Sequence, residues 1–277
     1  QARLAGMDGS AGRSARGVVL AVVGASGGCG ASTLAAACAL HAAESGWSVG
    51  VVDGAAGGAG IDVVLGIEHV PGVRWPDLAG CRGRVDGLGL LSRMPRAGAV
   101  AVLAHCRDSP AQIGADAVRG VFAGLVEVLD LVVVDVPRSW ALQDWALPDG
   151  SLREAAVREA ALLDFAPREA ALPSLRAVVV AGAGIVELAA LAATAPRVAA
   201  RVPETYLVLR GRRLSRSLLD DVGAALDLPV LGVLDDDPSV GRDLARGIPP
   251  GRSRGPLADL ARAVVEALGG DRREAAS

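Results

Sequence analysis

Gly24-Ala25-Ser26-Gly27-Gly28-Cys29-Gly30-Ala31-Ser32-Thr33 is the stretch that decides the fold of this chain. The apolar run 18–23 precedes it and the helix-forming run 34–43 follows it. A strand, a glycine loop and a helix in this order are typical of a phosphate-binding loop, because backbone N–H groups and the helix N-terminus both attract an anion. The lysine that such a loop carries just before its serine is absent, since Ala31 occupies that position.

The composition describes a globular protein. The chain has 277 residues, of which 51% are hydrophobic and 21% charged, and this balance excludes global disorder. The net charge of −3 gives no reason to expect bulk affinity for nucleic acid. All 28 basic residues are arginine, so a missing lysine is weaker evidence here than in most chains. However, drift from lysine would most readily give arginine, and Ala31 is not arginine.

The chain shows no signal peptide and no apolar run of the roughly 18 residues that a membrane span requires. None of the four cysteines forms a C-x-x-C pair, so they are expected to be reduced thiols of a cytoplasmic protein. The start at Gln1 instead of Met predicts that the chain is a fragment, preceded by a further region.

Hydrophobic patterning predicts strands that alternate with helices. The expected strands are 18–23, 48–53, 88–91, 100–104, 131–137, 176–181, 206–210 and 229–234. The expected helices are 32–45, 61–66, 110–129, 151–171, 185–195, 215–226 and 256–268. This alternation predicts an α/β fold with a single doubly wound, mostly parallel sheet and helices on both faces. The expected domain is 17–268, with a flexible tail or linker at 1–16 and a polar tail at 269–277.

Three features should meet at the carboxyl edge of this sheet, where ligands of open parallel sheets bind. They are the glycine loop, Asp53 at the end of one strand, and Asp135 at the end of the most apolar strand. In phosphate-binding loop proteins, a hydroxyl after the loop holds Mg²⁺ and an acid at a second strand end orients its water shell. Ser32 and Asp135 suit these roles.

Several segments carry a resemblance to the MinD/ParA family. Residues 26–33 resemble its deviant Walker A loop, residues 53–55 stand where the family has D-x-D, and 135–137 resemble its Walker B motif. The pair 228–234 and 245–249 is similar to the family's C-terminal P-x-L-G segment. The resemblance implies a P-loop NTPase fold of the SIMIBI type over roughly residues 17–268.

Within the family, the chain is most similar to the degenerate CpaE/TadZ branch, and in particular to actinobacterial septum-site-determining (Ssd) proteins. The segments that carry this likeness are 28–35, 72–78, 133–138 and 207–211. The resemblance implies a regulatory or localisation protein for septum placement and cell division, or for Tad-type pilus and secretion assembly. It implies a homodimer with protein partners in that machinery, at the septum or pole, with no clear nucleic-acid site. A peripheral membrane contact stays open.

The resemblance also implies ATP and Mg²⁺ as ligands. The residues placed at the nucleotide are Gly27, Gly28, Cys29, Gly30, Ala31, Ser32, Thr33 and Arg210. The residues placed at Mg²⁺, directly or through water, are Ser32, Asp53 and Asp135.

Four departures from the family pattern weaken the chemistry. Both lysines of the loop are replaced, by Ser26 and Ala31; the second acid of D-x-D is replaced by Ala55; and Arg210 replaces an adenine-contacting asparagine. Losing one group that stabilises the transition state typically costs about 10²–10³ in rate. Backbone N–H groups of the loop remain, so we expect weak or moderate binding of ATP·Mg²⁺ with very slow or no hydrolysis. Arg138 and Arg210 are candidates to replace the missing lysine from a partner subunit.

Three alternatives compete with this interpretation. One is a scaffold that binds no nucleotide. Another is an active ATPase with an arginine in place of the lysine. The third is an NAD(P)-binding oxidoreductase of the Rossmann type, since Gly24-x-x-Gly27-x-x-Gly30 followed by Asp53 also fits a dinucleotide loop. A Tyr/Lys reductase site is excluded, because the chain has one tyrosine and no lysine.

Overall fold

One mixed sheet organises the molecule. The computed structural model describes residues 17–54, 58, 60–108, 113–139 and 175–274. The strands are β1 (Val18–Gly24), β2 (Val49–Asp53), β3 (Arg96–Ala97), β4 (Val100–Leu103), β5 (Leu131–Val136), β6 (Leu175–Gly182), β7 (Thr205–Arg210) and β8 (Val230–Leu234). They form one sheet in the order β3-β4-β2-β5-β1-β6-β7-β8, in which only the β3–β4 pair is antiparallel. The predicted α/β class and mostly parallel sheet are therefore confirmed.

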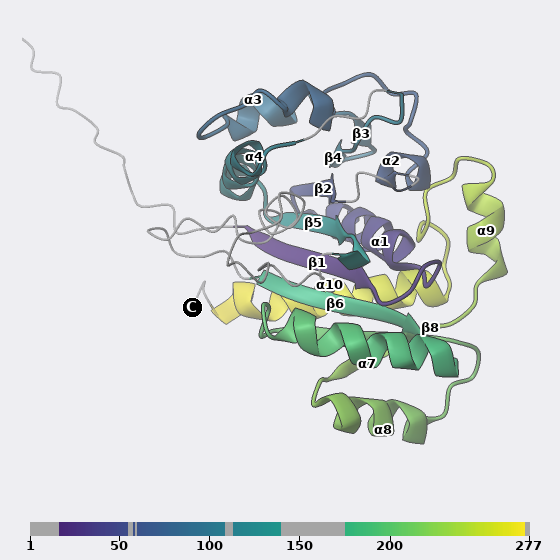
Figure 1. The fold of residues 1–277 in the computed structure, drawn as a ribbon. Helices are drawn as coiled ribbons and strands as arrows, with labels where there is room; N and C mark the ends of the chain where they lie inside the picture. Colours follow the sequence, from purple (N-terminus) through teal and green to yellow (C-terminus); the bar gives the residue numbers. More distant parts are fainter. Residues whose placement is uncertain (1–16, 55–57, 59, 109–112, 140–174, 275–277) are drawn as a thin grey trace, which may run out of the picture.

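Helices cover both faces of this sheet (Figure 1). The helices are α1 (Ala31–Glu44), α2 (Ile61–Val64), the 3-10 helix η1 (Trp75–Leu78), α3 (Gly87–Leu91), α4 (Ala115–Val128), α7 (Ile185–Ala199), α8 (Arg216–Leu226), α9 (Pro238–Leu244) and α10 (Pro256–Glu274). Side chains of α1 and α10 fill the core on one face, and side chains of α4 and α7 fill the core on the other. Successive residues of β1 enter the two cores alternately, because strand side chains point to opposite faces.

The two central strands, β1 and β5, are apolar along most of their length and deeply buried. β5 is buried along its whole length, and residues 19–23 of β1 are fully buried. Continuous apolar runs suit parallel strands that are covered on both faces. The register pairs Val22 of β1 with Asp135 of β5, and Asp135 with Asp53 of β2. The fold thus brings the two acids of the sequence analysis to neighbouring strand ends beside the glycine loop.

Two helix boundaries lie within one residue of the predicted ones and are marked by local capping features. Ser215 precedes α8, and its Oγ accepts a hydrogen bond of 3.2 Å from the N–H of Leu218. Gly46 follows the end of α1 with φ +88°, a left-handed conformation that glycine adopts without steric cost.

The segment 88–91 was predicted as a strand, and this prediction is wrong. These residues belong to α3, whose N-cap Asp86 accepts a hydrogen bond of 3.2 Å from the N–H of Leu88. Four apolar residues are too few for periodicity to separate a strand from a helix. The edge position of the sheet is taken instead by the two-residue strand β3.

Other predicted helices differ from the structure in their extent, and α10 continues to Glu274 instead of ending at 268, so most of the expected polar tail is helical. α4 begins at Ala115, and residues 110–112 of the predicted helix lie outside the described residues. α7 continues through Pro196 to Ala199, four residues beyond the expected end. The expected tail at 1–16 and helix at 151–171 lie outside the described residues as well.

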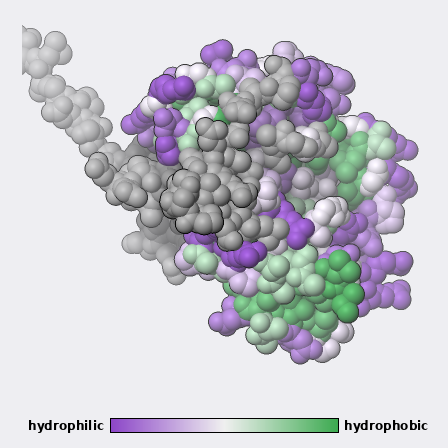
Figure 2. Space-filling model, in the orientation of Figure 1, coloured by the Kyte–Doolittle hydropathy of each residue, from purple (hydrophilic) through white to green (hydrophobic). Residues whose placement is uncertain are grey.

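An apolar area is exposed at the start of α7. Ile185 is 87% exposed and Val186 is 74% exposed. Figure 2 shows a strongly hydrophobic patch over one end of α7. Since α7 follows the carboxyl end of β6, this patch lies on the same edge of the sheet as the glycine loop.

Candidate functional site

The glycine loop ends in the first turn of α1, and two of its glycines are in left-handed conformations. Gly28 has φ +73° and Gly30 has φ +98°. A Cβ on Gly30 would also lie 3.0 Å from Cδ2 of Leu234, so both the backbone conformation and this tight contact disfavour a side chain there. No side chain caps α1, whose first N–H groups therefore stay available to an anion.

The loop forms one wall of a pocket of about 390 Å³ at the carboxyl edge of the sheet. Its lining residues are Gly24, Ser26, Gly27, Gly28, Cys29, Gly30, Ala31, Ser32, Thr33, Asp135, Val136, Pro137, Arg138 and Arg210. All eight residues that the sequence analysis placed at a nucleotide are among them, and so are two of the three residues placed at Mg²⁺.

Ser32 and Asp135 meet inside this pocket. Asp135 is 8% exposed, and burial raises the pKa of its carboxyl above the ordinary aspartate value. A hydrogen bond from the Ser32 hydroxyl acts in the opposite direction and lowers that pKa in part. A hydroxyl beside a carboxylate supplies two hard oxygen ligands of the kind that Mg²⁺ prefers. Within the described residues no group of three or more His, Cys, Asp or Glu is placed to hold a metal, so an ion here would depend on phosphate and water oxygens.

The raised pKa of Asp135 predicts a pH-dependent cost to stability. Below the ordinary aspartate pKa, the carboxyl is protonated in both states. As pH rises, the unfolded chain loses this proton first, and stability falls because the native state binds more protons. We expect Asp135→Asn to raise the urea midpoint at pH 7, with the gain vanishing below about pH 4. Asp220→Asn, on the exposed face of α8, is the control, and it should leave the urea midpoint unchanged both at pH 7 and below about pH 4. If Asp135→Asn left the urea midpoint at pH 7 unchanged, the raised pKa of Asp135 would be contradicted.

Asp53 lies beside the pocket but does not line it. Its side chain is buried, and Oδ2 accepts a hydrogen bond of 3.2 Å from the N–H of Ile61. Its backbone carbonyl accepts a hydrogen bond of 2.8 Å from Nε1 of Trp75, which is 1% exposed. The Trp75 ring stacks on His105 with a centroid distance of 6.0 Å, and burial lowers the pKa of His105 to about 4. Hydrogen bonds to both its side chain and its backbone thus hold Asp53 in place. Ala55, which stands at the second acid position of D-x-D, lies outside the described residues.

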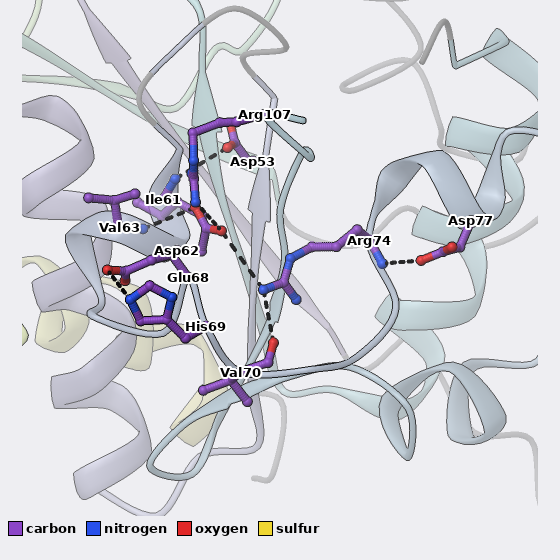
Figure 3. Close-up of polar contacts among 10 residues, drawn as sticks. All are labelled: Asp53, Ile61, Asp62, Val63, Glu68, His69, Val70, Arg74, Asp77 and Arg107. Carbon is purple, nitrogen blue, oxygen red and sulfur yellow. Dashed lines mark hydrogen bonds and ion pairs between the residues drawn. The ribbon is translucent and has the colours of Figure 1, made fainter. Parts of the chain in front are cut away.

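A buried charge cluster, which sequence reasoning missed, follows Asp53 (Figure 3). Asp62 is 2% exposed and accepts a hydrogen bond of 2.9 Å from Nη1 of Arg107. Nη2 of Arg74 lies 3.8 Å from the other carboxylate oxygen and donates to the Val70 carbonyl at 3.1 Å. The cluster joins α2 to the segments that follow β4 and precede η1. The available signal was an aspartate inside an otherwise apolar short helix.

Two cations border the pocket among its described lining residues, Arg138 and Arg210. Arg138 is exposed and lies two residues after the end of β5. Arg210 is the last residue of β7, and its guanidinium reaches the glycine loop of its own chain. Nη1 donates to the Gly28 carbonyl at 2.8 Å, and Nε donates to Asp236 at 3.1 Å.

Strand order separates this site from a dinucleotide site. In the Rossmann order 3-2-1-4-5-6, the strand that ends in the ribose-binding acid neighbours the glycine-loop strand. Here β5 lies between β1 and β2, so Asp135 and not Asp53 stands on the strand next to the loop. The alternative of a Rossmann-type oxidoreductase is therefore wrong.

No protein-family model matches the chain. The chain is 31% identical over 253 residues to the uncharacterized proteins Rv3660c and MT3760 of two Mycobacterium tuberculosis strains. That match covers 91% of this chain and 64% of each relative, so the chain spans less than two thirds of their length.

Solved structures share the fold at low sequence identity. The cell division ATPase MinD of Pyrococcus furiosus matches with a TM-score of 0.66 and 21% identity, over 91% of this chain and 99% of that chain. MinD of Pyrococcus horikoshii, complexed with Mg-ADP, matches with a TM-score of 0.66 and 18% identity, over 91% and 96%. A ParA family ATPase of Chlorobium tepidum matches with a TM-score of 0.68 and 14% identity, over 90% and 97%. In the described part of this chain, no helix has the length and hydrophobicity needed to cross a membrane.

Proposed function

We propose, starting from a fold that the chain shares with MinD and ParA P-loop ATPases, that this protein binds ATP·Mg²⁺ and hydrolyses it very slowly or not at all. One observation carries the proposal. The glycine loop and the Ser32–Asp135 pair line one pocket, while the lysine position next to them is occupied by uncharged Ala31. The chain therefore keeps groups that can bind a phosphate and lacks the positive charge that would assist its transfer.

The chain's own groups suit a bound triphosphate. N–H groups of the loop and of the first turn of α1 can donate to phosphate oxygens, as residues 27–33 were expected to do. Ser32 and Asp135 would hold Mg²⁺, which supplies neutralisation of phosphate charge when bound. Asp53 would act on that site through water, because it lies beside the pocket without lining it. Groups that would stabilise a transition state are absent at Ser26 and Ala31.

The proposed biological role follows the finer resemblance, to the CpaE/TadZ branch and the septum-site-determining proteins. The protein would be a nucleotide-dependent regulator or localisation factor for septum placement, or for Tad-type pilus or secretion assembly. Support comes from the fold shared with cell division proteins named MinD. The domain would extend over 17–268 after a tail or linker at 1–16, and α10 continues through residues 269–274 of the expected polar tail. The protein would act in the cytoplasm, at the septum or pole.

The exposed apolar side chains of Ile185 and Val186 support a homodimer or a protein partner at this edge of the molecule. Large apolar side chains that are exposed beside a site commonly mark an interaction surface. Nucleotide would then bind next to the contact, although the loop itself carries Ser26 where the family has its cross-subunit lysine.

Titration calorimetry with ATP and Mg²⁺, together with a phosphate-release assay, tests the proposal. We expect saturable binding that requires Mg²⁺ and a turnover far below that of active family members. Mass measurement by light scattering, with and without nucleotide, shows whether binding changes the oligomeric state. Absence of binding would favour the nucleotide-free scaffold, and rapid turnover would favour the active ATPase.

A further inference from the structure

Arg210 is held over the glycine loop by a rigid part of the sheet. It is the last residue of β7, paired in register with Gly182 on one side and Leu234 on the other. Its carbonyl accepts a hydrogen bond of 3.0 Å from the N–H of Ala183, and the N–H of Gly211 donates to Leu234 at 3.2 Å. Hydrogen bonds to both neighbouring strands therefore hold the backbone of Arg210, and this fixes the position from which its side chain extends.

The Arg210 side chain crosses β6 to reach the loop after β1. Nη1 lies 2.8 Å from the Gly28 carbonyl, and it would lie 3.9 Å from a Cβ on Gly30. The guanidinium thus borders the same pocket as Ala31. A guanidinium has five N–H groups, and the contacts to Gly28 and Asp236 use two of them. Three donors remain for a ligand in the pocket.

We propose that Arg210 supplies, within one chain, the phosphate-binding positive charge that the loop lacks at Ala31, and that Asp236 positions and partly neutralises it. The inference rests on the proposed nucleotide binding and names the group that carries it. A guanidinium is suited to this work because its planar fork matches the oxygens of a phosphate. The ligand would be recognised by its phosphates and not by its base.

Two comparisons within the molecule favour Arg210. Arg138 also lines the pocket, but it is exposed and lies after β5 instead of above the loop. Arg212 is exposed and does not line the pocket, although it lies only two residues from Arg210. Arg210 combines a place in the pocket wall with a direct bond to the loop backbone.

Asp236 has a role that can be separated from that of Arg210. The pair is half-exposed, with side chains 40% and 46% exposed, so solvent screens it and its own contribution to stability is small. The ion pair should affect ligand affinity more than it affects stability, since the Asp236 carboxylate competes with a phosphate for the Arg210 guanidinium. Asp236→Asn keeps an oxygen that accepts from Nε and removes the competing charge.

Fluorescence titration with mant-ATP and with mant-GTP, each with Mg²⁺, tests the inference on the full chain. Arg210→Ala should weaken both nucleotides by about 10- to 100-fold, the range for a hydrogen bond to a charged group. Arg210→Lys should recover part of the loss, because it keeps the charge without the fork. Arg212→Ala is the matched control and should stay within twofold of the wild type. Asp236→Asn should tighten binding by about two- to fivefold, and this gain should disappear in the double variant with Arg210→Ala.

The outcomes separate this inference from the function on which it rests. If the wild type binds neither nucleotide, both are overturned. If the wild type binds and Arg210→Ala stays within twofold of it, this inference alone is overturned. A loss confined to mant-ATP would show that Arg210 contacts the base, and it would also overturn the assignment to phosphate. Weaker binding in Asp236→Asn would overturn the role of Asp236.

Discussion

Replacing Asp62 by Asn should lower the free energy of unfolding by about 3 kcal/mol, because it leaves two arginines without their shared carboxylate. The Asp62 side chain is 2% exposed, whereas Arg74 and Arg107 are 13% and 43% exposed. Breaking a fully buried ion pair typically costs about 3–5 kcal/mol, and the lower end applies because Arg107 can regain water. Urea unfolding followed by circular dichroism measures the change.

Asp116→Asn is the matched control for this variant. Asp116 pairs with Arg119 on the surface of α4, where both side chains are about half-exposed or more. Surface pairs of this kind contribute about 0–1 kcal/mol. A loss below about 1 kcal/mol in Asp62→Asn would show that the buried cluster does not stabilise the segment after β2. A side chain at position 60 would also disturb this ion pair, since a Cβ on Gly60 would lie 2.4 Å from Oδ1 of Asp62.

Replacing Ala31 by Lys should tighten ATP·Mg²⁺ binding by about 10- to 100-fold without producing an active ATPase. Ala31 is the first residue of α1, half-buried, and lines the pocket. A lysine there would place an ammonium group at the phosphates, and a hydrogen bond to a charged group contributes about 1.5–3 kcal/mol. Turnover should remain slow, because Ser26 and Ala55 still replace two further groups of the family pattern. Titration calorimetry and phosphate release measure the two quantities separately.

Ala31→Met controls for the length of the new side chain, since it extends into the pocket without charge. Equal affinities of the Lys and Met variants would show that charge at this position is not what the loop lacks. Rapid turnover in Ala31→Lys would show instead that the lysine alone separates this chain from an active ATPase.

Much of the fold could be predicted from local pattern. The continuous apolar runs of β1 and β5 identified buried parallel strands, and the helix predicted over 215–226 agrees with α8 to within one residue. Short segments were less predictable. Residues 88–91 form part of a helix because Asp86 caps it, and four apolar residues carry no period that could have shown this. Asp62 gave only a weak signal, since its partners Arg74 and Arg107 are distant in sequence.

By itself, the sequence determined the glycine loop between strand and helix, the acids at two strand ends and the absence of a lysine, because each is a property of neighbouring residues. Only the tertiary structure decided that β5 separates β1 from β2, and that Arg210 crosses from β7 to the Gly28 carbonyl. The physical reason is that strand order and side-chain reach between strands depend on packing across the whole sheet. Local periodicity records which face of a strand is buried, and it does not record which strand lies beside it.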